Sequence, residues 1–253
     1  MTGARKPKAI LKIVGKSLKQ FDSVNLATAM RRLAKLSSGP EVARVVTHPD
    51  FAQLSVTIGR KAPATPSASD FAPRILGKHV GNACLAELVA RAQKQLPRFS
   101  EQNLANTAWA LVAMNVNEPV LQSVIAREVS VRLASRSAET FNCQELSNLC
   151  WAYAQLGLVA HHDMVQAAAR ALAARAREAN VQHIASTASA LARIGRYDDE
   201  IMERLGNAGC VRMGTFIPQA LSNLMWANGR LMHVHNRLLT ATQTRALAIL
   251  PCA

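Results

Sequence analysis

A sequence frame that recurs along the chain limits the folds open to it. The segment that begins at Phe99 reads FSEQNLANTAWALVAM, and related segments begin at Phe141 (FNCQELSNLCWAYAQLG) and at Phe216 (FIPQALSNLMWANGRLM). All three contain the frame F-x4-L-x-N-x2-W-A. A frame that returns at intervals of tens of residues is typical of repeat proteins, in which each repeat is one supersecondary unit. We call the leucine of this frame the anchor and count helix positions from it.

Weaker copies extend the series. The segment NVQHIASTASALARIG places Ile184 at the anchor position and Ser189 where the other copies have Trp. An earlier copy, FDSVNLATAMRRLAKL, begins at Phe21, and a shortened one follows Phe71. The anchors from Leu104 onward are separated by 42, 38 and 37 residues, and they are Leu104, Leu146, Ile184 and Leu221.

The repeat unit predicts two helices. Each frame is followed by a second helical pattern, at residues 120–134, 164–177 and 199–210, and Pro119, Gly157 and Gly195 fall where the first helices should end. One such pair cannot bury its own apolar face, so the pairs must stack. The sequence therefore predicts an all-α fold, an α-solenoid of degenerate helix-turn-helix repeats of about 38 residues that form an armadillo/HEAT-like superhelix.

The chain divides into three parts in this interpretation. Residues 1–20 form a basic N-terminal segment, either an organelle-targeting sequence or a solvated basic tail. Residues 21–98 hold degenerate N-terminal repeats, with a second helix expected near residues 49–60 and a Pro/Ser loop at residues 61–70. Residues 99–253 hold four helical-pair repeats.

The charge of the chain suggests an anionic partner. The net charge is +14, with about +12 in residues 1–98 and about +2 in residues 99–253, and such a field attracts polyanions such as nucleic acid. No apolar run reaches the roughly 18 to 20 residues of a membrane span, and no signal peptide is evident. We expect no membrane insertion and a soluble intracellular protein with reduced cysteines.

One polar face of the first helix is the candidate RNA-binding surface. At about 100° per residue, positions +2, +6 and +9 lie opposite the apolar stripe, and equivalent positions of a solenoid line up along one surface. Small polar residues recur at +2 and basic or amide residues at +9, and the first copy adds two arginines. The predicted RNA-binding residues are Arg31, Arg32, Lys35, Asn106, Asn148, Gln155, Ser186, Arg193, Asn223 and Arg230.

Two alternatives concern single positions of this face. The Asn residues at +2 either meet base edges, or instead form hydrogen bonds between neighbouring helices or cap the preceding turn. The Trp residues at +5 either stack on unpaired bases or pack between repeats, and the alanine that follows each Trp favours packing. The basic residues are expected to meet phosphates.

The frame F-x4-L-x-N-x2-W-A resembles the octatricopeptide-type repeats of algal organelle proteins. It is also similar to the helical repeats found beside RAP and FAST-kinase-like domains and in repeat subunits of the kinetoplastid RNA-editing substrate-binding complex. The resemblance covers roughly residues 20–245 and is strongest at residues 99–157 and 216–232. It implies a protein of mitochondria or plastids that binds single-stranded RNA in transcript processing, editing, stability or translation, together with other subunits of a ribonucleoprotein complex.

No catalytic arrangement stands out in the sequence. His161, His162 and Asp163 lack further ligands at zinc spacing, and no Ser/His/Asp or Cys/His order is evident. We therefore expect a protein that is not an enzyme and that holds no metal and no cofactor. The competing hypotheses are a protein-protein interaction scaffold of HEAT/armadillo type, favoured by the nearly neutral residues 99–253, and an enzyme whose catalytic domain lies outside this chain.

Overall fold

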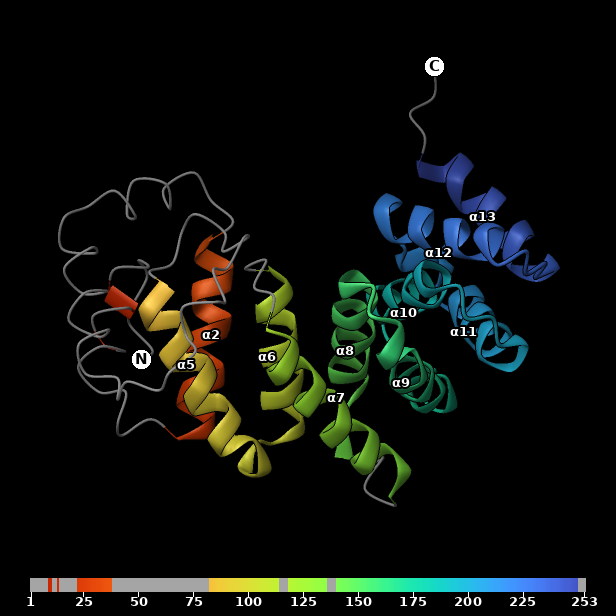
Figure 1. The fold of residues 1–253 in the computed structure, drawn as a ribbon. Coiled ribbons are helices and arrows are strands. Elements are labelled where there is room, and N and C mark those ends of the chain that lie inside the picture. The colour runs from red at the N-terminus through yellow and green to blue at the C-terminus, as the bar shows by residue number, and fades with distance from the viewer. Residues whose placement is uncertain are drawn as a thin grey trace. The chain divides into compact units, whose positions relative to one another are not determined.

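A computed structural model of the chain describes residues 9–10, 13, 22–37, 82–113, 118–135 and 140–249 (Figure 1). Within these ranges the structure is helical and contains no strand, so the all-α prediction is confirmed there. The chain divides into two compact units, residues 1–125 and 126–253. The second helix expected near residues 49–60, the loop at residues 61–70 and the copy after Phe71 lie outside the described residues.

The unit of residues 126–253 contains two layers of helices. The first helices of three repeats pack side by side in the order α8, α10, α12, and the second helices contact one another in the order α9, α11, α13 (Figure 1). Two short 3-10 helices, η4 and η5, lie before α9 and α12. The bounds are α8 Cys143–Leu156, η4 Val159–His161, α9 His162–Ala174, α10 Val181–Ile194, α11 Asp199–Val211, η5 Met213–Thr215, α12 Pro218–Arg230 and α13 Asn236–Ile249.

The unit of residues 1–125 contains α2 (Ser23–Ser37), α5 (Asn82–Gln95), η2 (Leu96–Arg98), α6 (Glu101–Ala113) and the first part of α7 (Pro119–Ala134). Helix α2 packs against both α5 and α6. The anchors Leu26 and Leu104 are 78 residues apart, which is about twice the repeat period. Their helices, α2 and α6, nevertheless pack against each other. In the other unit, the first helices that pack together belong to consecutive repeats. In this part of the chain, two first helices that pack together are therefore not consecutive in the repeat series.

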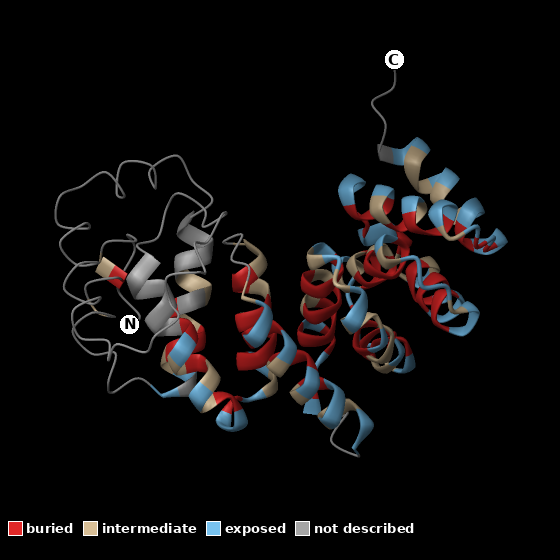
Figure 2. Cartoon of the chain, viewed as in Figure 1, coloured by how far each residue is buried: buried red, intermediate tan, exposed pale blue. Residues whose placement is uncertain are grey.

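The repeat frame supplies the buried core. The anchors and the phenylalanines that precede α6, α8 and α12 are almost fully buried, and buried residues line the sides of the helices that face one another (Figure 2). Each such side chain contributes about 1.5 to 3 kcal/mol through removal of apolar surface from water. The alanine at position +6 is buried in every copy from α6 onward, and its small side chain permits close packing of neighbouring helices. These residues are Ala110, Ala152, Ala190 and Ala227.

Local capping fixes where the first helices begin and end. Asn142 and Asn180 cap α8 and α10 in capping boxes, each accepting a hydrogen bond from a backbone N–H of the first turn. Gly157 and Gly195 end the same helices in the left-handed conformation, with φ of 64° and 67°, as the sequence predicts. The expectation for Pro119 is wrong: it is the first residue of α7, where its fixed φ suits a helix start.

Candidate functional site

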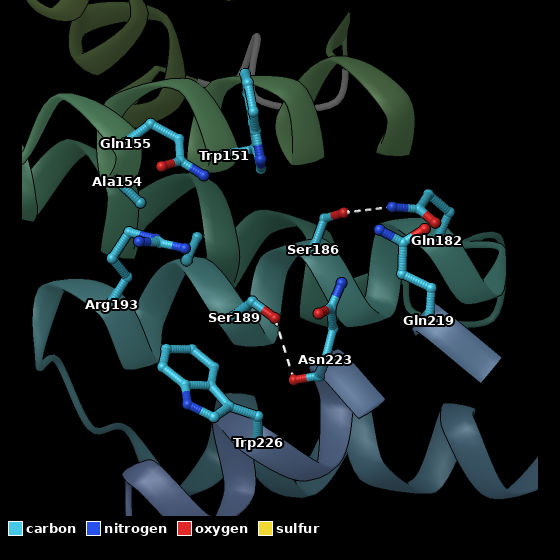
Figure 3. A pocket seen from close by; sticks show the side chains of 11 residues that line it. Trp151, Ala154, Gln155, Gln182, Ser186, Ser189, Arg193, Gln219, Asn223 and Trp226 are labelled. Atoms are coloured by element: carbon cyan, nitrogen blue, oxygen red, sulfur yellow. Dashed lines mark hydrogen bonds between the residues drawn. The ribbon is translucent and has the colours of Figure 1, made fainter. Parts of the chain in front are cut away.

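A groove of about 400 Å³ runs across the three first helices of the unit of residues 126–253 (Figure 3). Helix α10 forms its floor, and α8 and α12 form its two sides. Polar side chains and two indoles dominate the lining. The lining residues are Trp151, Ala154 and Gln155 from α8, Gln182, Ser186, Ser189, Ala190 and Arg193 from α10, and Gln219, Asn223 and Trp226 from α12.

The groove is lined by residues that occupy equivalent positions in neighbouring repeats. Because α8, α10 and α12 lie side by side, positions −2, +2, +5 and +9 of neighbouring copies face the same space. Position +5 provides Trp151, Ser189 and Trp226. The two glutamines at −2, Gln182 and Gln219, precede the anchor and were not among the predicted site residues, although glutamine recurs at −2 in every copy from α6 onward.

The structure brings together four of the predicted RNA-binding residues. Gln155, Ser186, Arg193 and Asn223 line the groove. Asn148 and Arg230 lie on α8 and α12 but outside the lining. The remaining predicted residues belong to the unit of residues 1–125: Asn106 on α6, Arg31 and Arg32 on α2, and Lys35, which is on α2 with its side chain outside the described part of the structure.

The predicted face is displaced by one position. Position +6 is buried in every copy from α6 onward, whereas the residues at +5 are half-buried or exposed. On a helix of about 100° per residue, +5 and +6 lie about equally far, roughly 50°, on either side of the direction shared by +2 and +9. Packing buries the +6 side, so +5 supplies the accessible side chains of the polar surface, and Ala190 at +6 of α10 borders the groove only as a buried residue.

The tryptophans are more exposed than packing between repeats predicts. Trp226 is 48% exposed, and Trp109 and Trp151 are half-buried. Trp151 and Trp226 extend from α8 and α12 on opposite sides of the α10 floor (Figure 3). The prediction of buried tryptophans is wrong for Trp226, and the groove presents two indoles to a ligand.

The groove carries one positive charge and no carboxylate. Arg193 is exposed and has no hydrogen bond or ion pair to any described residue. Two other arginines of this unit are paired: Arg170 contacts Asp198 at 2.6 Å, and Arg196 contacts Asp163 at 3.1 Å. The guanidinium of Arg193 is therefore available to an anion.

Hydrogen bonds hold the groove floor and leave amides free. Ser189 Oγ donates to the carbonyl oxygen of Asn223 at 3.1 Å and joins α10 to α12. Gln182 Nε2 donates to Ser186 Oγ at 2.9 Å. The side-chain amides of Gln155, Gln219 and Asn223 form no hydrogen bond to the described residues, so each offers a donor and an acceptor. For Asn223, a side-chain bond between helices is not observed.

Other clusters offer less chemistry. Burial raises the pKa of Cys150 to about 12, so this thiol is protonated at neutral pH and a poor nucleophile. Across the described ranges, no group of three or more His, Cys, Asp or Glu side chains is arranged to hold a metal ion. The helices in these same ranges are all too short or too polar to cross a membrane.

The chain matches no protein-family model and no curated protein.

Proposed function

We propose that this protein binds single-stranded RNA along the face formed by α8, α10 and α12, and that its helix pairs form an armadillo/HEAT-like α-solenoid with no catalytic role. The observation that carries the proposal is the composition of the groove. It combines the unpaired guanidinium of Arg193, three free amides and two accessible indoles, and it contains no carboxylate. Each of these groups has a counterpart in an unpaired nucleotide.

The chemistry of single-stranded RNA fits these groups. Unpaired bases stack on aromatic side chains and offer their hydrogen-bonding edges to amides and hydroxyls, while arginine binds phosphate. Stacking of one base on an aromatic side chain contributes about 1 to 3 kcal/mol and tolerates any sequence. The amides of Asn223 and Gln155 would add preference among bases. The net charge of +14 would favour encounter with the polyanion.

The biological setting of the proposal comes from the repeat frame. Its resemblance to octatricopeptide-type repeats supports a role in organellar RNA metabolism, in processing, editing, stability or translation. Under this proposal the protein acts in mitochondria or plastids and has other subunits of a ribonucleoprotein complex as partners.

The alternative is a protein-protein interaction scaffold. The nearly neutral charge of residues 99–253 favours it. Aromatic-lined grooves also bind extended peptides. A lysine-bearing peptide does not suit this groove, because no carboxylate lines it and Arg193 would repel the ammonium group. The groove therefore favours an anionic ligand over a basic peptide.

The salt dependence of binding to a labelled 12-nucleotide RNA tests the proposal. Each phosphate contact made by a single-stranded RNA contributes about −0.7 to the slope of log affinity against log salt. We expect Arg193→Gln and Arg230→Gln, on α10 and α12, each to make the slope shallower by about that amount, with similar losses across unrelated RNA sequences.

A matched control separates local contacts from total charge. Arg204 is exposed on α11 and pairs with Glu200 at 2.8 Å, so Arg204→Gln removes the same charge away from the groove. We expect its slope to equal that of the wild type. Equal binding by the wild type and a variant with both neutralisations, measured at physiological salt, would contradict the proposed surface.

A further inference from the structure

One repeat lacks the tryptophan that the others have at position +5. Trp109, Trp151 and Trp226 occupy this position in α6, α8 and α12, whereas α10 has Ser189. In the structure Ser189 lies on the groove floor between the helices that carry Trp151 and Trp226 (Figure 3). The groove is thus located where the missing indole would stand.

We propose that the serine at position 189 opens a slot for one nucleotide, and that an unpaired base of bound RNA takes the space of the missing indole. The base contacts the rings of Trp151 and Trp226, and its phosphate meets Arg193. The amide of Asn223 and the hydroxyl of Ser186 bind the base edge. This inference rests on the proposed RNA binding and assigns one nucleotide to one place along the face.

The slot is formed before a ligand arrives. The Ser189 Oγ to Asn223 carbonyl bond ties the floor to α12, and Ala190 beside it is buried. The groove volume of about 400 Å³ lies within the roughly 300 to 1,000 Å³ of small-molecule sites. A base therefore enters without displacing a core side chain, and little binding energy is spent on ordering the site.

The groups around the slot select a nucleotide over other ligands. A flat aromatic ring gains from both indoles, and an anionic group gains from Arg193, which has no carboxylate nearby in the groove. A nucleotide supplies both in one ligand. An acidic peptide can pair with Arg193 but leaves the indoles without a ring to stack on.

Refilling the slot is the direct test. Ser189→Trp restores the residue found at this position in the neighbouring copies, and we expect it to weaken binding of the labelled 12-nucleotide RNA at least about tenfold, since one base–aromatic stack is lost. Ser130 is exposed on α7, outside the groove, and Ser130→Trp is the control for adding an indole. Its affinity should equal that of the wild type. Thermal melting checks that both variants are folded.

A second pair of variants keeps the test informative if Ser189→Trp does not fold. Trp226 is exposed, so Trp226→Ala should preserve the fold and weaken RNA binding about tenfold, whereas Trp226→Phe keeps a ring and retains most of the affinity. In a Trp109→Phe background the remaining indoles, Trp151 and Trp226, report on the slot. Their fluorescence should be quenched by RNA and much less by an RNA whose bases are replaced by abasic sites.

The possible failures are distinguishable. If the wild type binds RNA but Ser189→Trp and Trp226→Ala bind it equally well without quenching, the slot is wrong and RNA binding stands. If the wild type binds no RNA, the proposed function fails and the slot fails with it. If a polyglutamate peptide displaces the RNA and quenches the indoles equally, the groove is an acidic-peptide site and the nucleotide slot is overturned.

Discussion

The ring of His235 packs directly against Gly206, so closely that a β-carbon on Gly206 would lie 2.4 Å from His235 Cδ2. Both residues are buried. His235 lies at the start of α13, and its Nδ1 accepts a hydrogen bond from the backbone N–H of Leu238 at 3.0 Å. The beginning of α13 is therefore held against α11 at a position that only glycine fits.

Replacement of Gly206 by alanine should lower the free energy of unfolding by about 1 to 3 kcal/mol, because the added methyl group overpacks the contact and the ring cannot move without losing its bond to Leu238. Gly229 in α12 provides the control, since a β-carbon added there would have no atom of another side chain within 4 Å. Gly229→Ala should raise the free energy of unfolding by about 0.5 to 1 kcal/mol. Urea denaturation measures both, and a loss of equal size in the two variants would contradict the assigned contact.

Asp198 joins the start of α11 to α9, and its removal should be costly. Its Oδ1 accepts from the backbone N–H of Ile201 at 3.1 Å, and its Oδ2 accepts from Arg170 at 2.6 Å and from Gln166 at 3.2 Å. Asp198→Ala should lower the free energy of unfolding by about 1 to 2 kcal/mol through loss of the N-cap. Asp198→Asn keeps a capping oxygen and loses the ion pair, so it should fall between the wild type and the alanine variant at pH 7.

The same site should respond to acid. Burial raises the pKa of Asp198, but hydrogen bonds from Ile201, Arg170 and Gln166 outweigh it, and the net pKa in the folded chain is below 3.8. A carboxyl with a lowered folded pKa stabilises the fold above its unfolded pKa and loses that contribution as the pH falls through its folded pKa. The difference between the wild type and Asp198→Asn should therefore shrink between pH 5 and pH 2.5. A difference that is constant over this range would exclude the carboxylate as its source.

His183 should make stability depend on pH near neutrality. Burial lowers its pKa from 6.5, and its Nδ1 accepts a hydrogen bond from the backbone N–H of Asn180 at 3.4 Å, which requires an unprotonated nitrogen. Because the unfolded chain binds the proton more readily, the stabilisation is complete above pH 6.5 and decreases as the pH falls through the folded pKa.

His183→Gln tests this pH dependence. Glutamine fits the third position of a capping box and does not titrate. Chemical denaturation at pH 7.5 and pH 5.5 should show a smaller loss of stability in this variant than in the wild type. Some dependence should remain, because burial also lowers the pKa of His161. Identical pH profiles for the two proteins would show that the His183 bond does not contribute.

Local chemistry explains what the sequence predicted correctly. The capping residues Asn142 and Asn180 and the left-handed glycines Gly157 and Gly195 act through contacts within one turn of the chain, so they mark helix ends without knowledge of the fold. The anchors are buried for a similarly simple reason, since an apolar stripe with a helical period must face other helices. The same periodicity predicted four residues that line the groove, which are Gln155, Ser186, Arg193 and Asn223.

The helices, their period and the polar face at +2 and +9 could be predicted from the residues alone, because these features depend on residue spacing along a single helix. The sequence left +5 and +6 undecided, since both lie about equally far from the centre of that face. Only tertiary packing buried Ala190 and left Ser189 partly exposed in the groove, because the difference depends on which side of α10 the other helices cover. The pairing of α2 with α6 across 78 residues was likewise a tertiary outcome, because no local signal records which helices become neighbours.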